Sequence, residues 1–245
     1  MNKIIKNDED DLLKYLLLDG LDPNQTNEEG KTLLIFACEK NAHKCIKALI
    51  QYGADINKTD NFNCTPLIKA SQMGHIEAVR ALLSNPECKI NQQDNNKRSA
   101  LYCSAALGRD VISRELLQAG ANIEQEDKYG WTPFLISAWN GQFSMVQLLA
   151  AENANINAAD INGDTALHHT CKAGKLEMTE LLCSLNLDIN KPNNLNITAY
   201  QYSNGYSEVK ECLNKVIEKK RNERTDSLLR QAFSEDRPKR IKPKL

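Results

Sequence analysis

The histidines and cysteines are the residues of this sequence most suited to catalysis or metal binding, but their spacing does not favour either kind of site. The chain has 4 histidines and 8 cysteines. His168, His169 and Cys171 stand close enough together to suggest zinc, but no second pair of ligands follows at zinc-finger spacing. A cysteine–histidine nucleophile pair stays open in principle, although this many residues of both types makes chance proximity common. No glycine-rich phosphate loop or EF-hand occurs. We therefore expect no enzyme, no metal and no cofactor.

The feature that dominates the sequence is a repeat of 33 or 34 residues. With Thr132 taken as a marker, a hydroxyl residue recurs in phase along the chain, and a leucine follows 17 residues after each of the first five markers. The markers are Thr32, Thr65, Ser99, Thr132, Thr165 and Thr198. Several columns that agree in phase are much stronger evidence than any single motif, so this is a repeat protein.

Each repeat predicts a pair of short helices. In Thr65-Pro66 and Thr132-Pro133, a hydroxyl N-cap precedes proline at the first helical position, where a missing N–H costs nothing. Nine residues after most markers stands glycine, as at Gly74, which suits a left-handed helix end. A second apolar helix follows, as in 76–83 and 143–149. Two helices of this size cannot bury their apolar faces alone, so the repeats must stack.

These residues resemble the ankyrin repeat family, whose units carry a D-x-x-G-x-T-P-L-H pattern followed by G-A-D-I-N. Segments 60–83, 160–169 and 52–57 match that pattern closely, and the resemblance covers roughly 1–214. It implies an all-α solenoid of stacked helix-turn-helix units with β-turn fingers, about seven units with their caps. His75 and His168 fall on histidines of the pattern, so we expect hydrogen-bonding turn residues rather than catalysts.

Some positions depart from the pattern. Proline is replaced after four markers, which predicts looser helix starts there, and the segment 84–89 holds one extra residue. Two residues before the marker, a tight turn needs glycine or asparagine, but the third full repeat has Lys97.

The repeats do not fill the whole chain. We divide it into an N-terminal capping partial repeat (1–26), five full repeats (27–192), a shortened capping repeat (193–217) and a basic extension (218–245). The acidic cluster 8–11 suits the start of a capping helix, with binding of a basic partner as the alternative.

The C-terminal extension differs in charge from the repeats. From residue 215 onward there are 11 Lys and Arg against 5 Asp and Glu, whereas the preceding chain has 20 against 27. We expect the last helix to run on into KKRNER. An apolar stripe of Leu228, Leu229 and Phe233 should dock on the repeats or on a partner, because it is too short to be a stable helix alone. A nuclear import signal and plain disorder are the alternatives.

Composition suits a cytoplasmic protein. The chain is 41% hydrophobic with net charge −1, and no apolar run approaches the roughly 20 residues of a membrane span. The first residues lack the apolar core of a signal peptide. Cys38 and Cys171 share a column with Ala105 and Ala138, so the cysteines are interpreted as small buried hydrophobes in a reducing compartment.

If the family's geometry applies, side chains near the inter-repeat turn and the end of the first helix face a concave groove. The middle repeats are apolar and aromatic there, and such residues dominate the energy of interfaces. The predicted partner-binding residues are Phe62, Met73, Arg98, Leu107, Lys128, Tyr129, Trp131 and Trp139. The alternative is that these rings pack on one another and only stiffen the turns.

The sequence thus predicts a non-catalytic adaptor or scaffold that binds a protein or peptide in its groove as a monomer. One rival is an effector that an intracellular bacterium delivers into a host cell. Another is a nuclear regulator that acts through its basic tail, although we do not expect nucleic acid as the partner. An enzyme with an unrecognised cysteine site is the third. Neither partner nor organism follows from the sequence.

The cysteine assignment leads to a first prediction. Because the cysteines replace Ala, Ser and Leu in core columns, neither a chelator nor a reductant should move the thermal unfolding transition. Calorimetry of the full chain with and without EDTA or dithiothreitol checks this. A large loss of stability in either reagent would reopen the metal and enzyme hypotheses.

Overall fold

The computed structural model of the protein describes residues 2–235, which fall into two units. Of the described residues, the first comprises 2–166 with Asn193–Leu195, and the second comprises Leu167–Pro192 with 196–235. Within the described residues there are 14 α-helices and no strand, only isolated β-bridges such as Thr26 to Thr32. The predicted all-α solenoid is confirmed.

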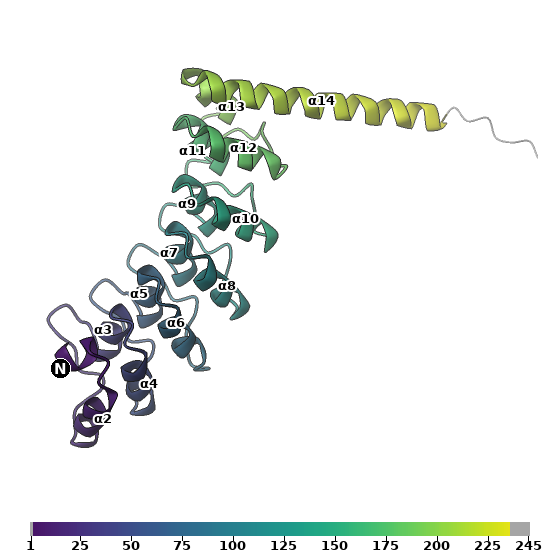
Figure 1. The fold of residues 1–245 in the computed structure, drawn as a ribbon. Coiled ribbons are helices and arrows are strands. Elements are labelled where there is room, and N and C mark those ends of the chain that lie inside the picture. The colour runs from purple at the N-terminus through teal and green to yellow at the C-terminus, as the bar shows by residue number, and fades with distance from the viewer. Residues whose placement is uncertain (1, 236–245) are drawn as a thin grey trace, which may run out of the picture. The chain divides into compact units, whose positions relative to one another are not determined.

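The first unit is a stack of helix pairs. In Figure 1, the first helices of successive repeats stand in one row, and the second helices in a parallel row. The pairs are α1 (Asn2–Lys6) with α2 (Asp10–Leu18), α3 (Leu33–Glu39) with α4 (His43–Gln51), α5 (Pro66–Met73) with α6 (Ile76–Leu83), α7 (Ala100–Ala106) with α8 (Asp110–Gln118), and α9 (Pro133–Trp139) with α10 (Phe143–Ala151).

The second unit contains the last repeat pairs. It holds α11 (Ala166–Lys172, whose first residue belongs to the first unit), α12 (Leu176–Ser184), α13 (Ala199–Tyr202), a 3₁₀ turn (Ser203–Gly205) and α14 (Ser207–Glu235). The first helix of the last repeat, α13, has 4 residues, whereas the first helix of the preceding repeat, α11, has 7. Because α13 is short, the buried Val209 and Leu213 follow the marker of their repeat after fewer residues than the matching residues of other repeats. The division into caps and full repeats stays a prediction.

The helix starts follow the predicted hydroxyl caps. The Oγ1 atoms of Thr65 and Thr132 accept hydrogen bonds from the backbone N–H of Ile68 (3.1 Å) and Leu135 (3.2 Å). Ser99 caps α7 in the same way without a following proline, by accepting from Tyr102 N at 3.1 Å. The cap therefore satisfies an orphan N–H in both kinds of repeat, as an N-cap does.

The turn before each marker is left-handed even where the sequence departs from glycine. Gly130 has φ 78°, Asn63 has φ 61°, and Lys97 adopts the same conformation with φ 59°. Lys97 therefore differs from the pattern in residue type but not in backbone. Neighbouring repeats hold the turn in this shape, at a cost that a side chain with Cβ must bear.

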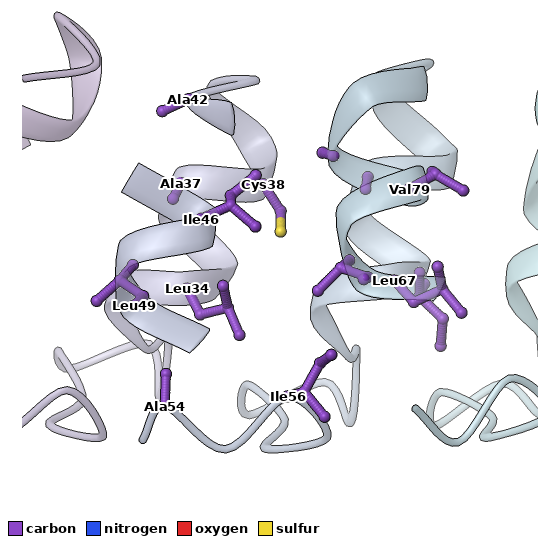
Figure 2. Packing of buried hydrophobic residues seen from close by; sticks show 14 of the residues in the cluster. Leu34, Ala37, Cys38, Ala42, Ile46, Leu49, Ala54, Ile56, Leu67 and Val79 are labelled. Atoms are coloured by element: carbon purple, nitrogen blue, oxygen red, sulfur yellow. The ribbon is translucent and has the colours of Figure 1, made fainter. Parts of the chain in front are cut away.

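The core lies between the two helices of each repeat and between neighbouring repeats. Figure 2 shows Leu34, Cys38 and Ile46 of one repeat beside Leu67 and Val79 of the next. These side chains are at most 2% exposed and belong to one cluster, which extends from α1 to α8. Each repeat therefore supplies part of its neighbour's core.

A ladder of asparagine side chains joins successive loops that follow the second helices. Asn57 accepts from Lys89 N (2.8 Å) through Oδ1 and donates through Nδ2 to Glu87 O (2.9 Å). Asn24 makes the equivalent pair of bonds one repeat earlier, to the loop at 53–55. One amide thus satisfies a donor and an acceptor of the next loop, which fixes the distance between repeats.

Six of the eight cysteines are buried, including the two in the alanine column, whereas Cys88 and Cys212 are half-buried. Cys38 and Cys171 have no exposed surface, and burial raises the pKa of the Cys171 thiol to about 12. Burial also raises the pKa of Cys38, and that of Cys88 to about 11. These thiols are therefore protonated at neutral pH, which makes them poor nucleophiles and poor metal ligands.

The last helix runs on as predicted, through KKRNER to Glu235. Side chains 221–228 are exposed, Leu228 at 59%, so this part of α14 does not pack against the rest of its unit. Docking of the stripe that Leu228 begins stays a prediction. The side chains of Leu229 and Phe233, and residues 236–245, lie outside the described part of the chain. No helix in residues 2–235 is both long and apolar enough to cross a membrane.

Replacing Lys97 by glycine should stabilise the protein. A non-glycine residue in the left-handed conformation destabilises the folded state by about 1–2 kcal/mol, and glycine removes this strain. Glycine also raises the entropy of the unfolded chain, which offsets part of the effect, so we expect the free energy of unfolding to rise by about 1 kcal/mol. Urea or thermal unfolding measures it. Lys97→Ala, which keeps the Cβ, is the control and should give no gain. If Lys97→Gly lowers stability, the left-handed turn is not strained.

Candidate functional site

The fingers between repeats are built on aspartates whose side chains accept hydrogen bonds from the backbone of the turn. The Oδ1 atom of Asp127 accepts hydrogen bonds from the backbone N–H groups of Tyr129 (2.8 Å) and Trp131 (2.9 Å). Asp94 does the same in the preceding finger, with Asn96 N (2.8 Å) and Arg98 N (2.9 Å). These bonds close a tight turn, as Asx motifs do, and leave the middle residues of the turn at its tip.

Neighbouring fingers are joined through their backbones. Lys128 N donates to Asn96 O at 3.0 Å, and Ile161 N donates to Tyr129 O at 3.1 Å. The finger at 127–131 is thus held on both sides, so its tip side chains project from a fixed backbone. A binding site on such a frame is preorganised, and little entropy would be lost when a ligand binds.

A hollow of about 620 Å³ lies beside this finger, in the first unit. Its lining combines two successive fingers with the first helices α7 and α9. The lining residues are Asn96, Arg98, Tyr102, Ala106, Asp127, Lys128, Tyr129, Trp131, Ile136, Trp139 and Asn140. Five of the eight predicted partner-binding residues therefore come together: Arg98, Lys128, Tyr129, Trp131 and Trp139.

The other three predicted residues are exposed but do not line this hollow. Phe62, Met73 and Leu107 have 64%, 49% and 48% of their surface exposed. Phe62 is on the finger before α5, and Met73 and Leu107 are at the ends of α5 and α7. They extend the apolar surface along the preceding repeats.

The two tryptophans differ in burial. Their rings meet edge to face, with centroids 6.0 Å apart and planes at 84°. Trp131 is half-buried against the core, whereas Trp139 remains 39% exposed and Tyr129 53% exposed. Ring packing, the alternative raised by the sequence, thus occurs between the tryptophans, but it leaves Trp139 and Tyr129 accessible to solvent.

Tyr102 and Asp127 are members of the site that the sequence analysis missed. The Tyr102 hydroxyl donates to Asp127 Oδ2 at 3.0 Å, and burial, followed by the charge of Asp127, raises the pKa of this tyrosine. The sequence contains a signal for Tyr102, which stands three residues after its marker. At the same position the other early repeats have the aliphatic residues Ile35, Ile68 and Leu135. A tyrosine in an aliphatic column needs a partner for its hydroxyl.

The two basic residues of the hollow are held differently. Arg98 pairs with the buried Asp94, with Nε and Nη2 at 2.8 and 2.7 Å from Oδ2. Lys128 is exposed, and its Nζ lies 4.9 Å from the centroid of the Tyr129 ring. Arg98 therefore stabilises the finger, while Lys128 presents its charge to solvent at the rim.

His75 and His168 form hydrogen bonds with backbone, as predicted. The Nε2 atom of His75 lies 3.2 Å from Glu39 O, and that of His168 lies 3.1 Å from Ile197 O. Each ring therefore links one repeat to backbone of a neighbouring repeat. Neither pairing places a nucleophile beside a base, which a catalytic pair would require.

Comparison with known proteins agrees with this architecture of stacked helical repeats. The family model "Ankyrin repeats (3 copies)" matches residues 1–94 and 86–160, and "Ankyrin repeat" matches 162–194. The chain therefore belongs to the ankyrin repeat family. Its repeats are generally protein–protein interaction modules, and the family is generally non-catalytic.

The curated relatives resemble this chain in their ankyrin repeats, although they are proteins of different kinds. The chain is 29% identical over 161 residues to YahD of Escherichia coli (strain K12), described as an ankyrin repeat protein, covering 50% of this chain and 80% of YahD. It is 31% identical over 161 residues to potassium channel AKT1 of Arabidopsis thaliana, covering 51% of this chain and 18% of AKT1. It thus spans less than a fifth of that channel.

Solved structures share the fold. The ankyrin repeat domain of Bcl-3, a member of the IkappaB protein family, matches with a TM-score of 0.80 and 24% identity, covering 87% of this chain and 96% of that one. The human ASB11 ankyrin repeat domain matches at 0.75 and 22% identity, covering 88% and 96%. At such identities the likeness shows the fold alone.

Removing the Tyr102 hydroxyl should lower the free energy of unfolding, because this group helps to hold the finger at 127–131. Tyr102→Phe leaves one oxygen of Asp127 without its donor, and a hydrogen bond to a charged group is worth about 1.5–3 kcal/mol. Chemical denaturation should show a loss in that range. Tyr129→Phe, on an exposed ring of the same finger, is the matched control and should change stability by less than about 0.5 kcal/mol. Equal effects would mean that the buried bond contributes nothing.

Proposed function

We propose that this chain is a non-catalytic adaptor that holds a protein or peptide partner, as a monomer in the cytoplasm. The partner lies along the concave face formed by the fingers and the ends of the first helices. Its contacts centre on the hollow beside the finger at 127–131, and Phe62, Met73 and Leu107 extend the contact toward the N-terminus.

The observation that carries this proposal is the exposure of large rings on a rigid frame. Trp139 and Tyr129 keep 39% and 53% of their surface exposed. The core of the same repeat is filled by other residues, such as Phe134 and Leu135, so it does not need these two rings. Exposed apolar clusters of this kind mark interaction sites more often than they serve folding. Tryptophan and tyrosine are also the residues that most often anchor interfaces.

The structure of the finger supports the same conclusion. Asp127 and Asn96 fix the backbone on which Tyr129 stands, by bonds that do not involve its ring. Folding therefore places few demands on the residue type at the tip, and an aromatic side chain there is free to serve a partner. Asn140, which also lines the hollow, donates through Nδ2 to Ala106 O at 2.8 Å and so joins α9 to α7.

Truncating the exposed rings should reduce binding without unfolding the protein. Peptides selected on the full-length chain from a random phage-displayed dodecamer library serve as the probe. Trp139→Ala should weaken their binding by about 2 kcal/mol or more, roughly thirtyfold, because a true anchor costs that much when removed. Fluorescence anisotropy measures affinity, and calorimetry checks folding. Trp131→Ala is less suitable because this half-buried ring also supports the core.

Val111→Ala is the matched control. Val111 is 58% exposed on α8, a second helix, and does not line the hollow. Its replacement should change affinity less than about twofold, since surface changes away from an interface are nearly neutral. If selected peptides bind wild type, Trp139→Ala and Val111→Ala equally well, the site is not on this face.

A further inference from the structure

The rim of the hollow carries a positive charge that the protein does not neutralise. Lys128 stands at the finger tip with an exposed side chain, and no ion pair involving it occurs among residues 2–235. Its Nζ lies 4.9 Å from the centroid of the Tyr129 ring. The cation therefore lies beside the apolar surface and is still exposed to solvent.

The carboxylate that lines the hollow, Asp127, and the one that pairs with Arg98 are already in use. Asp127 binds the backbone N–H groups of Tyr129 and Trp131 through Oδ1 and the Tyr102 hydroxyl through Oδ2. Asp94 has a side chain only 1% exposed and is paired with Arg98. Neither can turn toward a ligand without breaking the finger, so among the residues that line the hollow the accessible charge is that of Lys128.

We propose that the hollow takes a peptide segment in which an aromatic or long aliphatic side chain stands within two residues of an aspartate or glutamate. This rests on the proposed binding function and names the chemistry of the partner. The apolar side chain packs on Trp139 and Tyr129, and the carboxylate pairs with Lys128. Two residues of extended chain span about 7 Å, which matches the closeness of Lys128 to the Tyr129 ring.

A cationic ligand fits less well. Aromatic rings can bind ammonium groups over their faces, but one face of Tyr129 already has the cation of Lys128 over it, which would repel a second cation near the ring. A lysine or arginine of a partner would meet a like charge, and the carboxylate in the lining, Asp127, is already hydrogen-bonded. An uncharged apolar segment would fit the rings but leave Lys128 unpaired, so it should bind with less selectivity.

Charge reversal tests the proposal. Dodecamers selected on the full-length chain should carry aspartate or glutamate within two residues of an aromatic residue or leucine. Lys128→Glu should weaken their binding at least tenfold, and replacing the acidic residue of the peptide by lysine should restore binding to this variant. Raising NaCl from about 50 to 500 mM should weaken the wild-type complex several-fold, because the pair is exposed to screening.

Lys97→Glu is the control for net charge. Lys97 is an exposed lysine on the preceding finger and does not line the hollow, so its reversal should change affinity less than twofold. If selected peptides depend on Trp139 but lack an acidic residue, or if Lys128→Glu does not weaken them, this inference fails and the binding function stands. If peptides bind independently of Trp139, the binding function itself fails.

Discussion

Stacking between neighbouring repeats is the interaction on which this structure depends. A 7-residue helix such as α9 is far shorter than the roughly 12–15 residues that an isolated helix needs in water. Two such helices together still leave one apolar face open. Each repeat therefore folds against the next, and Leu34 of one and Leu67 of another belong to one continuous core (Figure 2). Stability then accumulates along the stack as a sum of neighbouring interfaces.

This constraint separates the residues that fold the protein from those that are free to bind. Core columns, helix caps and loop asparagines such as Asn57 each meet a need of the adjacent repeat. At the finger tips the fold depends on the backbone alone. In the finger at 127–131, hydrogen bonds to Asp127 and Asn96 fix that backbone. The tips and the ends of the first helices can therefore vary in residue type, and a partner can be recognised there without cost to the fold.

Most of the fold could be predicted from the sequence because every structural need recurs in each repeat. Thr65 and Thr132 cap helices, and the glycines end them, at the same phase in successive copies. Where one copy changes, the neighbours still impose the conformation, so Lys97 takes a turn that its residue type disfavours. The long α14 was also predictable from helical spacing, but the exposure of Leu228 was not, because it depends on which surfaces lie within reach.

The candidate site was predictable only in part. Column positions brought Tyr129, Trp131 and Trp139 to one surface, since position within the repeat fixes which face a side chain occupies. The hollow also requires a contact between two repeats, Tyr102 with Asp127, which no single column reveals. Phe62 shares the column of Tyr129 but lies two repeats away, so it cannot line the same hollow.

The claim that partners meet the finger side of the stack is tested most directly by site-specific photo-crosslinking. A photoreactive phenylalanine analogue replaces either Tyr129 at the finger tip or Val111 on α8, both exposed. Each protein is irradiated with a labelled selected peptide, in the presence or absence of excess unlabelled peptide. The account predicts a competable crosslink from position 129 and none from position 111. A competable crosslink from position 111 with none from position 129 would contradict it.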